Sequence, residues 1–209
     1  MAEAYKLYGR KNAGSLAPQM VLEEVGARYE LFWVSKTPAE LEAFRRINPL
    51  GKIPVLVLPD GAVLCESAAI LIHLTDLYPA ARLAPPPTTT AHARFLQWMT
   101  FLSSSLYETA IRYYYAERYS SAGADAAEQI KAQALSDYGR HLEFAQASLS
   151  PYVLGEQFSA ADPYLHMLAG WYPGDVPALH KRLPRLAQHV ELVRRRPATR
   201  KAEADHEQT

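Results

Sequence analysis

The chain has 209 residues, of which 49% are hydrophobic and 21% charged, and its formal net charge is zero. That composition is typical of a globular protein with one large domain or two small ones, and the neutral balance argues against general nucleic-acid binding. We expect neither a signal peptide nor a membrane span, because the start lacks an apolar core and no run approaches roughly 18 apolar residues. The single cysteine, Cys65, cannot form an internal disulfide, which favours a cytoplasmic location. CxxC and HxxxH pairs are absent, so we expect no metal site.

The first 80 residues alternate between short apolar runs and helical patterns. Asp60 and Gly61 separate two of the apolar runs, which is a strong hairpin signal. A strand, a helix and a second strand at this spacing predict a right-handed parallel crossover. The predicted strands are 5–8, 29–34, 55–58 and 62–64, and the predicted helices are 15–26, 37–47 and one that begins at 66.

The character of the sequence changes after a linker at 81–90, where three consecutive prolines block both helix and central strand. No strand alternation follows it, so we expect an all-α second domain. This gives an N-terminal domain at 1–80 and a helical domain at 91–209. The last residues, 202–209, are expected to fray. The predicted helices of the second domain are 91–119, 126–148, 159–171 and 183–196.

Two neighbouring features in the first domain predict a binding site. The Ile53-Pro54 bond precedes a strand and is a candidate cis-proline turn, which leaves the backbone of Ile53 free to pair with an extended ligand. A helix opens at Glu66-Ser67, and a helix N-terminus favours a carboxylate. Together they indicate a pocket for an extended, peptide-like, anionic small molecule, although each is also compatible with a simple strand start or helix cap.

The motifs Asn48-Pro-x-Gly-Lys-Ile-Pro-x-Leu, Glu66-Ser-x-Ala-Ile and Ser159-x-x-Asp162 occur in this order along nearly the whole chain. With the element order, they resemble the cytosolic glutathione S-transferases. Ser15-Leu-Ala-Pro18 and Leu96-Gln-Trp98 resemble the bacterial, beta-like branch of that family. The resemblance implies an α/β plus all-α fold, with a thioredoxin-like N-terminal domain followed by a helical bundle.

The resemblance also implies that glutathione is the co-substrate and that no cofactor is needed. The backbone of Ile53, before Pro54, would pair with the cysteinyl backbone of glutathione by β-augmentation. Glu66 and Ser67 would hold the γ-glutamyl head, with Ser67 on the carboxylate and Glu66 on the ammonium. Lys52, and more weakly Lys36, would face the glycyl carboxylate.

The sequence departs from its relatives at the catalytic position, because the cysteine of the beta-like branch is replaced by Gly14. A mixed disulfide with an enzyme thiol at that position is therefore excluded. Ser15 and Asn12 remain as donors that can stabilise the glutathione thiolate, with Ser15 placed slightly ahead. The alternative is that Ser15 only caps the helix and Asn12 only forms the turn. Cys65 adjoins Glu66, and we interpret it as a small buried residue rather than a redox group.

Aromatic residues on the first long helix of the second domain predict a hydrophobic substrate site. In beta-like relatives the position of Tyr107 often holds a pocket-lining histidine. Tyr114 and Tyr115 belong to a run of three tyrosines that cannot all point the same way on a helix. One or two would line a site between the domains, and the others would pack in the core or meet a partner subunit.

We therefore predict a glutathione S-transferase that conjugates the glutathione thiolate to apolar electrophiles, as in detoxification. A homodimer is expected, with no nucleic-acid or membrane partner. Two alternatives keep the fold: a glutathione-dependent disulfide reductase or peroxidase, and a binding protein without turnover. The physiological second substrate does not follow from the sequence, because scattered helix side chains form that pocket.

Overall fold

The computed structural model describes residues 4–207, which form two compact units. The first contains the described residues up to Ala84 and those from Arg195 onward. The second runs from Pro85 to Arg194. The sequence prediction assigned residues 91–209 to the helical domain, so the return of the C-terminal segment to the first unit is a difference that the structure introduces.

The first unit is built on a four-stranded sheet in the order β2-β1-β3-β4. β1 and β2 are parallel, as the predicted crossover requires, and β3 is antiparallel to both β1 and β4. The hairpin between β3 and β4 is confirmed. The strands are β1 (Tyr5–Gly9), β2 (Tyr29–Trp33), β3 (Val55–Val57) and β4 (Val63–Cys65).

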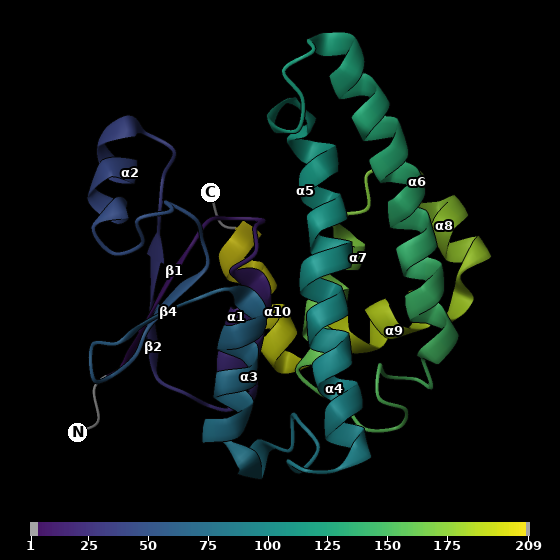
Figure 1. Cartoon of the computed structure of the whole chain (residues 1–209). Helices are drawn as coiled ribbons and strands as arrows, with labels where there is room; N and C mark the ends of the chain where they lie inside the picture. The colour runs from purple at the N-terminus through teal and green to yellow at the C-terminus, as the bar shows by residue number, and fades with distance from the viewer. Residues whose placement is uncertain (1–3, 208–209) are drawn as a thin grey trace. The chain divides into compact units, whose positions relative to one another are not determined.

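Helices cover both faces of this sheet. Figure 1 shows α2 on one side of the strands and α1 with α3 on the other. Phe44 of α2 packs against Val34 and Val55, and the residues that alternate with Val55 along β3 point to the opposite face. The thioredoxin-like order β-α-β-α-β-β-α is thereby confirmed. The helices of this unit are α1 (Leu16–Glu24), α2 (Pro38–Arg45), α3 (Ser67–Leu77) and α10 (Pro197–Glu207), with a 3₁₀ turn at Pro79–Ala81.

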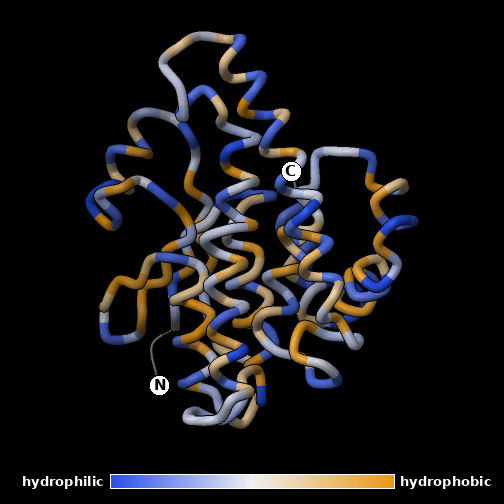
Figure 2. The backbone as a smooth tube through the Cα atoms, turned by 45° about the vertical axis from the view of Figure 1, so that its right-hand side comes forward, coloured by the Kyte–Doolittle hydropathy of each residue, from blue (hydrophilic) through white to orange (hydrophobic). Residues whose placement is uncertain are grey.

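The second unit is helical, and the only β-bridge among its described residues joins Tyr152 to Gly155. Hydrophobic and hydrophilic residues alternate along its helices in Figure 2, as amphipathic helices require. The central helix is α7, in which every residue from Ala161 to Ala169 is buried. The helices are α4 (Thr90–Phe101), α5 (Glu108–Tyr114), α6 (Ala124–Ser148), α7 (Ala161–Gly170), α8 (Val176–Arg182) and α9 (Pro184–Arg194), with a 3₁₀ turn at Ala116–Arg118.

The helix predicted at 91–119 changes its register in the middle. Between α4 and α5 the segment Leu102–Tyr107 is π-helical. The hydroxyl of Ser104 donates to the carbonyl of Thr100 at 2.8 Å, a back-bond that competes with the regular ladder. π-Helical turns are rare and are frequent at functional sites. The predicted pocket residue Tyr107 is the last residue of this one.

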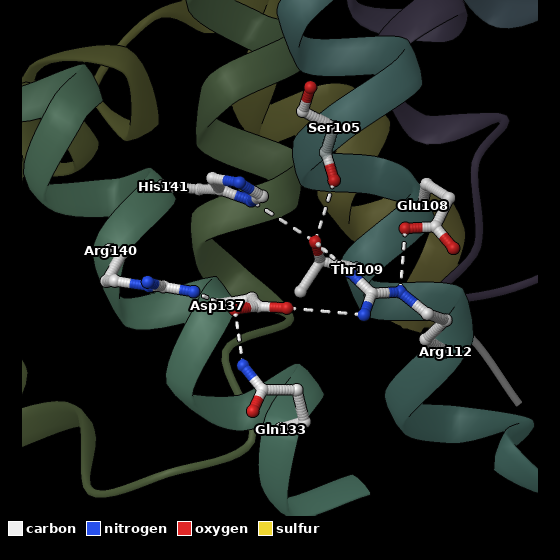
Figure 3. A network of polar contacts seen from close by, with 8 residues as sticks. All are labelled: Ser105, Glu108, Thr109, Arg112, Gln133, Asp137, Arg140 and His141. Carbon is white, nitrogen blue, oxygen red and sulfur yellow. Dashed lines mark hydrogen bonds and ion pairs between the residues drawn. The ribbon is translucent and has the colours of Figure 1, made fainter. Parts of the chain in front are cut away.

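A polar network fixes α5 against α6, as Figure 3 shows. The hydroxyl of Thr109, which is fully buried, donates to the carbonyl of Ser105 at 2.8 Å and lies 3.2 Å from Nδ1 of His141. The guanidinium of Arg112 donates to a carboxylate oxygen of Asp137 on α6 at 3.2 Å. These contacts hold the turn that follows the π-helix and so set the direction of the tyrosines on α5.

The prediction that the chain frays from residue 202 is wrong for the described residues. α10 extends to Glu207, and its Ala202 and His206 are buried. The reason is charge pairing with α1: Arg196 donates to both carboxylate oxygens of Glu24, at 2.6 and 2.8 Å. Residues 208 and 209 lie outside the described part of the chain.

Candidate functional site

The strand register brings three predicted segments to one end of the sheet. Val55, the first residue of β3, pairs with Tyr8 of β1 and with Cys65 of β4. Because β3 runs opposite to its neighbours, the residues before Val55 lie beside those that follow β1 and β4. The proline turn, the β1–α1 loop and the start of α3 therefore meet at this end of the sheet.

The peptide bond between Ile53 and Pro54 is cis, as the sequence analysis predicted. Neither the N–H nor the C=O of Ile53 has a hydrogen-bond partner among residues 4–207. Asn48 supports this turn from behind, because its buried side-chain amide donates to the carbonyl of Lys52 at 2.7 Å. The turn thus presents an unpaired strand edge at residue 53, which is the geometry that β-augmentation requires.

Glu66 occupies the N-cap position of α3 with an unusual backbone conformation, φ 68° and ψ 113°. A positive φ is uncommon for a non-glycine residue, and such outliers cluster at functional sites. The Glu66 side chain is exposed and forms no capping hydrogen bond, whereas Ser67 is buried at the first helical position. The simple capping role for the Glu66 side chain is therefore absent from the structure.

Ser15 lies at the start of α1, but its hydroxyl is turned into the protein. The side chain is fully buried, accepts from the backbone N–H of Arg10 at 3.3 Å and donates to the Arg10 carbonyl at 3.2 Å. A Cβ atom on Gly9 would collide with the Ser15 side chain, so the glycine permits this close approach. Ser15 makes no side-chain capping bond to α1. Its visible role is to close the β1–α1 loop.

Asn12 lies at the exposed middle of the same loop, in the left-handed region at φ 52°. Asparagine tolerates this conformation better than most residues. Its backbone N–H donates to Nδ1 of His206 on α10 at 3.0 Å. Its side-chain amide has no hydrogen-bond partner in the part of the chain that the structure describes. The loop thus offers one free amide donor to solvent.

Cationic side chains accompany this end of the sheet. Lys52, beside the proline turn, and Lys36, which follows β2, are both exposed. Arg10 is half-buried and donates from Nε to the carbonyl of Val34 at 3.1 Å, which ties the loop to the end of β2. Arg10 is not among the predicted site residues, because an arginine in a loop gives no local signal of its partners.

Cys65 ends β4 with a half-buried side chain that packs against the cluster around Val34, Phe44 and Val55. Burial, and then the charge of Glu66, raise the pKa of its thiol above the ordinary value. The thiol form is favoured, and the thiolate is the reactive species. This environment is that of a packed structural residue.

In the second unit the structure brings two of the three predicted tyrosines to one partner, Trp171. The ring of Tyr107 lies 5.4 Å from that of Trp171, edge to face, and the hydroxyl of Tyr114 donates to the Trp171 carbonyl at 2.7 Å. Tyr115 lies apart from them, with the guanidinium of Arg118 stacked 4.0 Å from its ring centre. The prediction missed Trp171, whose position at the end of α7 is set by tertiary packing.

Residues 4–207 contain no cluster of three or more His, Cys, Asp or Glu side chains suited to a metal ion. None of the helices among them has the length and apolar character that crossing a membrane requires.

Fold and site together define the class: a thioredoxin-like unit with an open cis-proline edge, joined to a helical unit. The family model for the N-terminal domain of glutathione S-transferases matches residues 15–77 of this chain. An uncharacterised GST-like protein of Escherichia coli K12, YncG, is 30% identical over 175 residues, covering 81% of this chain and 82% of that protein. The chain belongs to the glutathione S-transferase family.

Solved structures agree with this assignment. A glutathione transferase homologue from Sulfitobacter with bound glutathione superposes with a TM-score of 0.87 at 25% identity, covering 98% of this chain and 99% of its own. A sphingomonad glutathione S-transferase in complex with glutathione gives a TM-score of 0.82 at 30% identity, covering 98% and 100%. The predicted fold, family and transferase class are thereby confirmed.

Proposed function

We propose that this protein binds glutathione at the shared end of the sheet in its first unit and conjugates the glutathione thiolate to apolar electrophiles. The observation that carries the proposal is the cis Ile53-Pro54 turn, whose unpaired backbone lies next to the start of α3. The cysteinyl unit of glutathione would pair with Ile53 as an added strand. The γ-glutamyl carboxylate would meet the N-terminus of α3 at Ser67, and Glu66 would accept from the ammonium.

The glycyl carboxylate of glutathione is assigned to the lysines. Lys52 is the stronger candidate, because it adjoins Ile53 and its backbone carbonyl is fixed by Asn48. Lys36 is the weaker one, because it lies beyond the end of β2. Each lysine would act as an exposed point charge, so each would contribute only modestly to the affinity for glutathione.

For the sulfur, we favour Asn12 over Ser15, which reverses the order that the sequence suggested. The Ser15 hydroxyl already donates to the Arg10 carbonyl and would have to give up that bond to reach a thiolate. Asn12 is exposed and its side-chain amide is unpaired among the described residues. A donor directed at the thiolate lowers the pKa of the thiol by stabilising its charged form.

The second substrate is assigned to the aromatic side chains of the helical unit. Tyr107 and Tyr114 lie seven residues apart around Trp171, and they offer apolar ring surface with hydroxyl groups. Tyr115, also predicted there, carries Arg118 on its ring and is the weakest of the three. This combination suits an apolar electrophile that also has polar substituents.

The homodimer remains part of the proposal and is supported by an exposed phenylalanine on the helical unit. Phe144 of α6 is 51% exposed, and its ring lies 5.4 Å from Trp98 and 5.0 Å from Phe101 of α4. Trp98 is buried and Phe101 half-buried, so Phe144 presents an exposed ring above an aromatic cluster, a feature that suits an interaction surface. Analytical ultracentrifugation of the wild type should give a dimer, and Phe144→Glu should give a monomer. A monomeric wild type would contradict the dimer.

Calorimetric titration with glutathione tests the binding site. Glu66→Gln removes the charge that meets the ammonium, and we expect about a 10-fold weaker affinity, since a hydrogen bond to a charged group contributes about 1.5–3 kcal/mol. Glu30→Gln is the matched control, because Glu30 is an exposed glutamate near the start of β2. Binding that is absent in the wild type, or lost equally in both variants, would refute the site.

Conjugation of a chlorinated nitroarene tests the reaction and its sulfur ligand. Asn12→Ala should raise the pKa of the bound thiol and lower kcat by about 10-fold or more, the usual cost of one catalytic donor. Ser15→Ala should instead lower thermal stability, because it opens the bonds to Arg10. A full rate in Asn12→Ala with a loss confined to Ser15→Ala would restore Ser15 as the sulfur ligand.

A further inference from the structure

We propose that His206, near the C-terminal end of α10, is a positioning residue for the reaction, because it holds the backbone of Asn12 and thereby fixes the β1–α1 loop. This inference rests on the proposed function of that loop as the donor to the glutathione sulfur.

The contact itself is direct. The N–H of Asn12 donates to Nδ1 of His206 at 3.0 Å, and His206 is only 2% exposed. The ring of Trp33, the last residue of β2, lies 5.0 Å from the imidazole in an edge-to-face arrangement. The imidazole is thus held between the sheet end and the loop.

Other contacts hold the ends of the loop but not its middle. At the end of β1, Arg10 donates to the Val34 carbonyl and exchanges hydrogen bonds with the Ser15 hydroxyl. At the start of α1, the N–H of Leu16 donates to the carbonyl of Ala13. No other hydrogen bond reaches the backbone of residues 11 and 12 within the described part of the chain. His206 therefore determines where the exposed amide side chain of residue 12 is placed.

α10 is itself fixed strongly enough to act as this support. Besides the contacts of His206, it packs along α1, the helix that begins where the loop ends. Buried Gln19 of α1 donates to Asp205, the neighbour of His206, at 2.7 Å. Two ion pairs complete the attachment: Arg196 with Glu24 at 2.6 and 2.8 Å, and Lys201 with Glu23 at 2.6 Å.

The role of His206 is that of an acceptor rather than a packing element. Burial, opposed by Asp205 and assisted by Lys11, lowers its pKa to about 4, so the ring is neutral and Nδ1 accepts while Nε2 carries the proton. Nε2 is buried and has no partner within residues 4–207. A phenylalanine would fill the same space without an unsatisfied N–H, so packing alone does not account for an imidazole here.

Two substitutions separate these roles. His206→Phe keeps the ring and its contact with Trp33 but removes the acceptor. His206→Asn loses ring volume but places Oδ1 where Nδ1 stood. Thr199→Val is the matched control, because Thr199 is a buried polar residue of the same helix whose hydroxyl has no partner among the described residues.

The readouts are the pKa of bound glutathione, followed by thiolate absorbance against pH, and kcat and KM for conjugation. His206→Phe should raise the thiol pKa and lower kcat about 10-fold, since a small displacement of a catalytic group has effects of this size or more. Its KM for glutathione should stay within about twofold, because the proline turn and α3 are untouched. His206→Asn should recover most of the rate, and Thr199→Val should behave as wild type.

The proposal is overturned if His206→Phe keeps the thiol pKa and kcat of the wild type, or if folded His206→Asn is as impaired as His206→Phe. Amide hydrogen exchange of the wild type gives a test that needs no variant. Slow exchange of the Asn12 N–H supports the contact, and exchange at the rate of an open loop refutes it. A wild type that does not bind glutathione would refute the proposed function, while the Asn12 exchange rate would still decide whether His206 holds the loop.

Discussion

The replacement of Asp162 by asparagine tests the main polar support of the helical unit. Asp162 is fully buried near the start of α7. One carboxylate oxygen accepts from the Val153 N–H at 2.8 Å and from Nε2 of His189 at 3.0 Å. The other accepts from the N–H of Ser159 at 2.7 Å and from its hydroxyl at 3.0 Å. The motif Ser159-x-x-Asp162 has the spacing of a capping box, which accounts for the contact with Ser159 but not for the other two partners.

The expected magnitude follows from these four bonds. Asparagine keeps one acceptor oxygen, so the bonds on that side survive in neutral form, but its NH₂ group faces the N–H of Ser159, donor against donor. Two bonds to a charged group, at about 1.5–3 kcal/mol each, are lost. Part of this lost stability is offset, because folding no longer requires the desolvation of a buried carboxylate. We expect Asp162→Asn to destabilise the protein by about 2–4 kcal/mol.

Urea unfolding followed by circular dichroism measures this loss as a lower transition midpoint at an unchanged slope. Asp175→Asn is the matched control: Asp175 caps α8 through a single exposed bond to the N–H of Ala178 at 2.9 Å. Asparagine caps helices about as well as aspartate, so we expect a change of at most about 0.5 kcal/mol. An equal midpoint shift in the two variants would refute the reasoning that burial and the number of partners make Asp162 important.

Two further predictions concern titrating groups of the first unit. Burial lowers the pKa of His206 from 6.5 to about 4, so the unfolded chain binds the proton first as the pH falls. The contribution of His206 to stability is therefore full above pH 6.5 and declines between pH 6.5 and about 4. The loss of about 3 kcal/mol in this window should disappear in His206→Asn. Urea midpoints of both proteins across this range check the prediction, and parallel curves would contradict it. The raised pKa of the Cys65 thiol predicts slow alkylation by iodoacetamide relative to free cysteine and unchanged conjugation in Cys65→Ala; a variant without turnover would show that the thiol takes part in the reaction.

The features predicted correctly from the sequence have causes that lie within a few residues of each other. The cis Ile53-Pro54 bond, the hairpin at Asp60-Gly61 and the helix that begins at Ser67 each depend on local backbone preferences. The resemblance to a known family then arranged these pieces into the right topology. The fold of the first unit and the location of its open edge were therefore accessible without coordinates.

The orientation of single side chains was not accessible in the same way. A serine at a helix start favours capping, yet Ser15 points away from the helix N–H groups because Gly9 leaves space for its side chain on the neighbouring strand. Trp171 contacts both Tyr107 and Tyr114 because α7, which ends just before it, is packed in the core of the helical unit. In both cases the deciding neighbour belongs to another element, which the periodic pattern of a single element does not identify.

The C-terminal helix shows the same limit on a larger scale. Lys and Arg residues are frequent between 181 and 201, a composition typical of a solvated helix, and a solvated helix end would fray. The complementary acids, Glu23 and Glu24, stand at the end of α1, and no periodicity links them to Arg196 and Lys201. These ion pairs hold α10 in place. Opposite charges that give the chain a net charge of zero thus attach its C-terminal segment to α1.

The attachment of α10 to α1 brings a residue near the C-terminal end of the chain to the loop that would face the glutathione sulfur. Asn12 and His206 are 194 residues apart in the sequence, so no local window contains both the proposed sulfur ligand and the group that holds it. The motifs around the proline turn and α3 predict how glutathione is bound, but they do not predict the conformation of the loop that would face its sulfur. If the loop is fixed by His206 from the other end of the chain, substitutions that remove this contact should change the thiol pKa and kcat while leaving glutathione affinity intact. Reactivity and affinity would then be adjusted by different parts of the sequence, with the catalytic loop supported by the C-terminal helix rather than by the motif that binds the substrate.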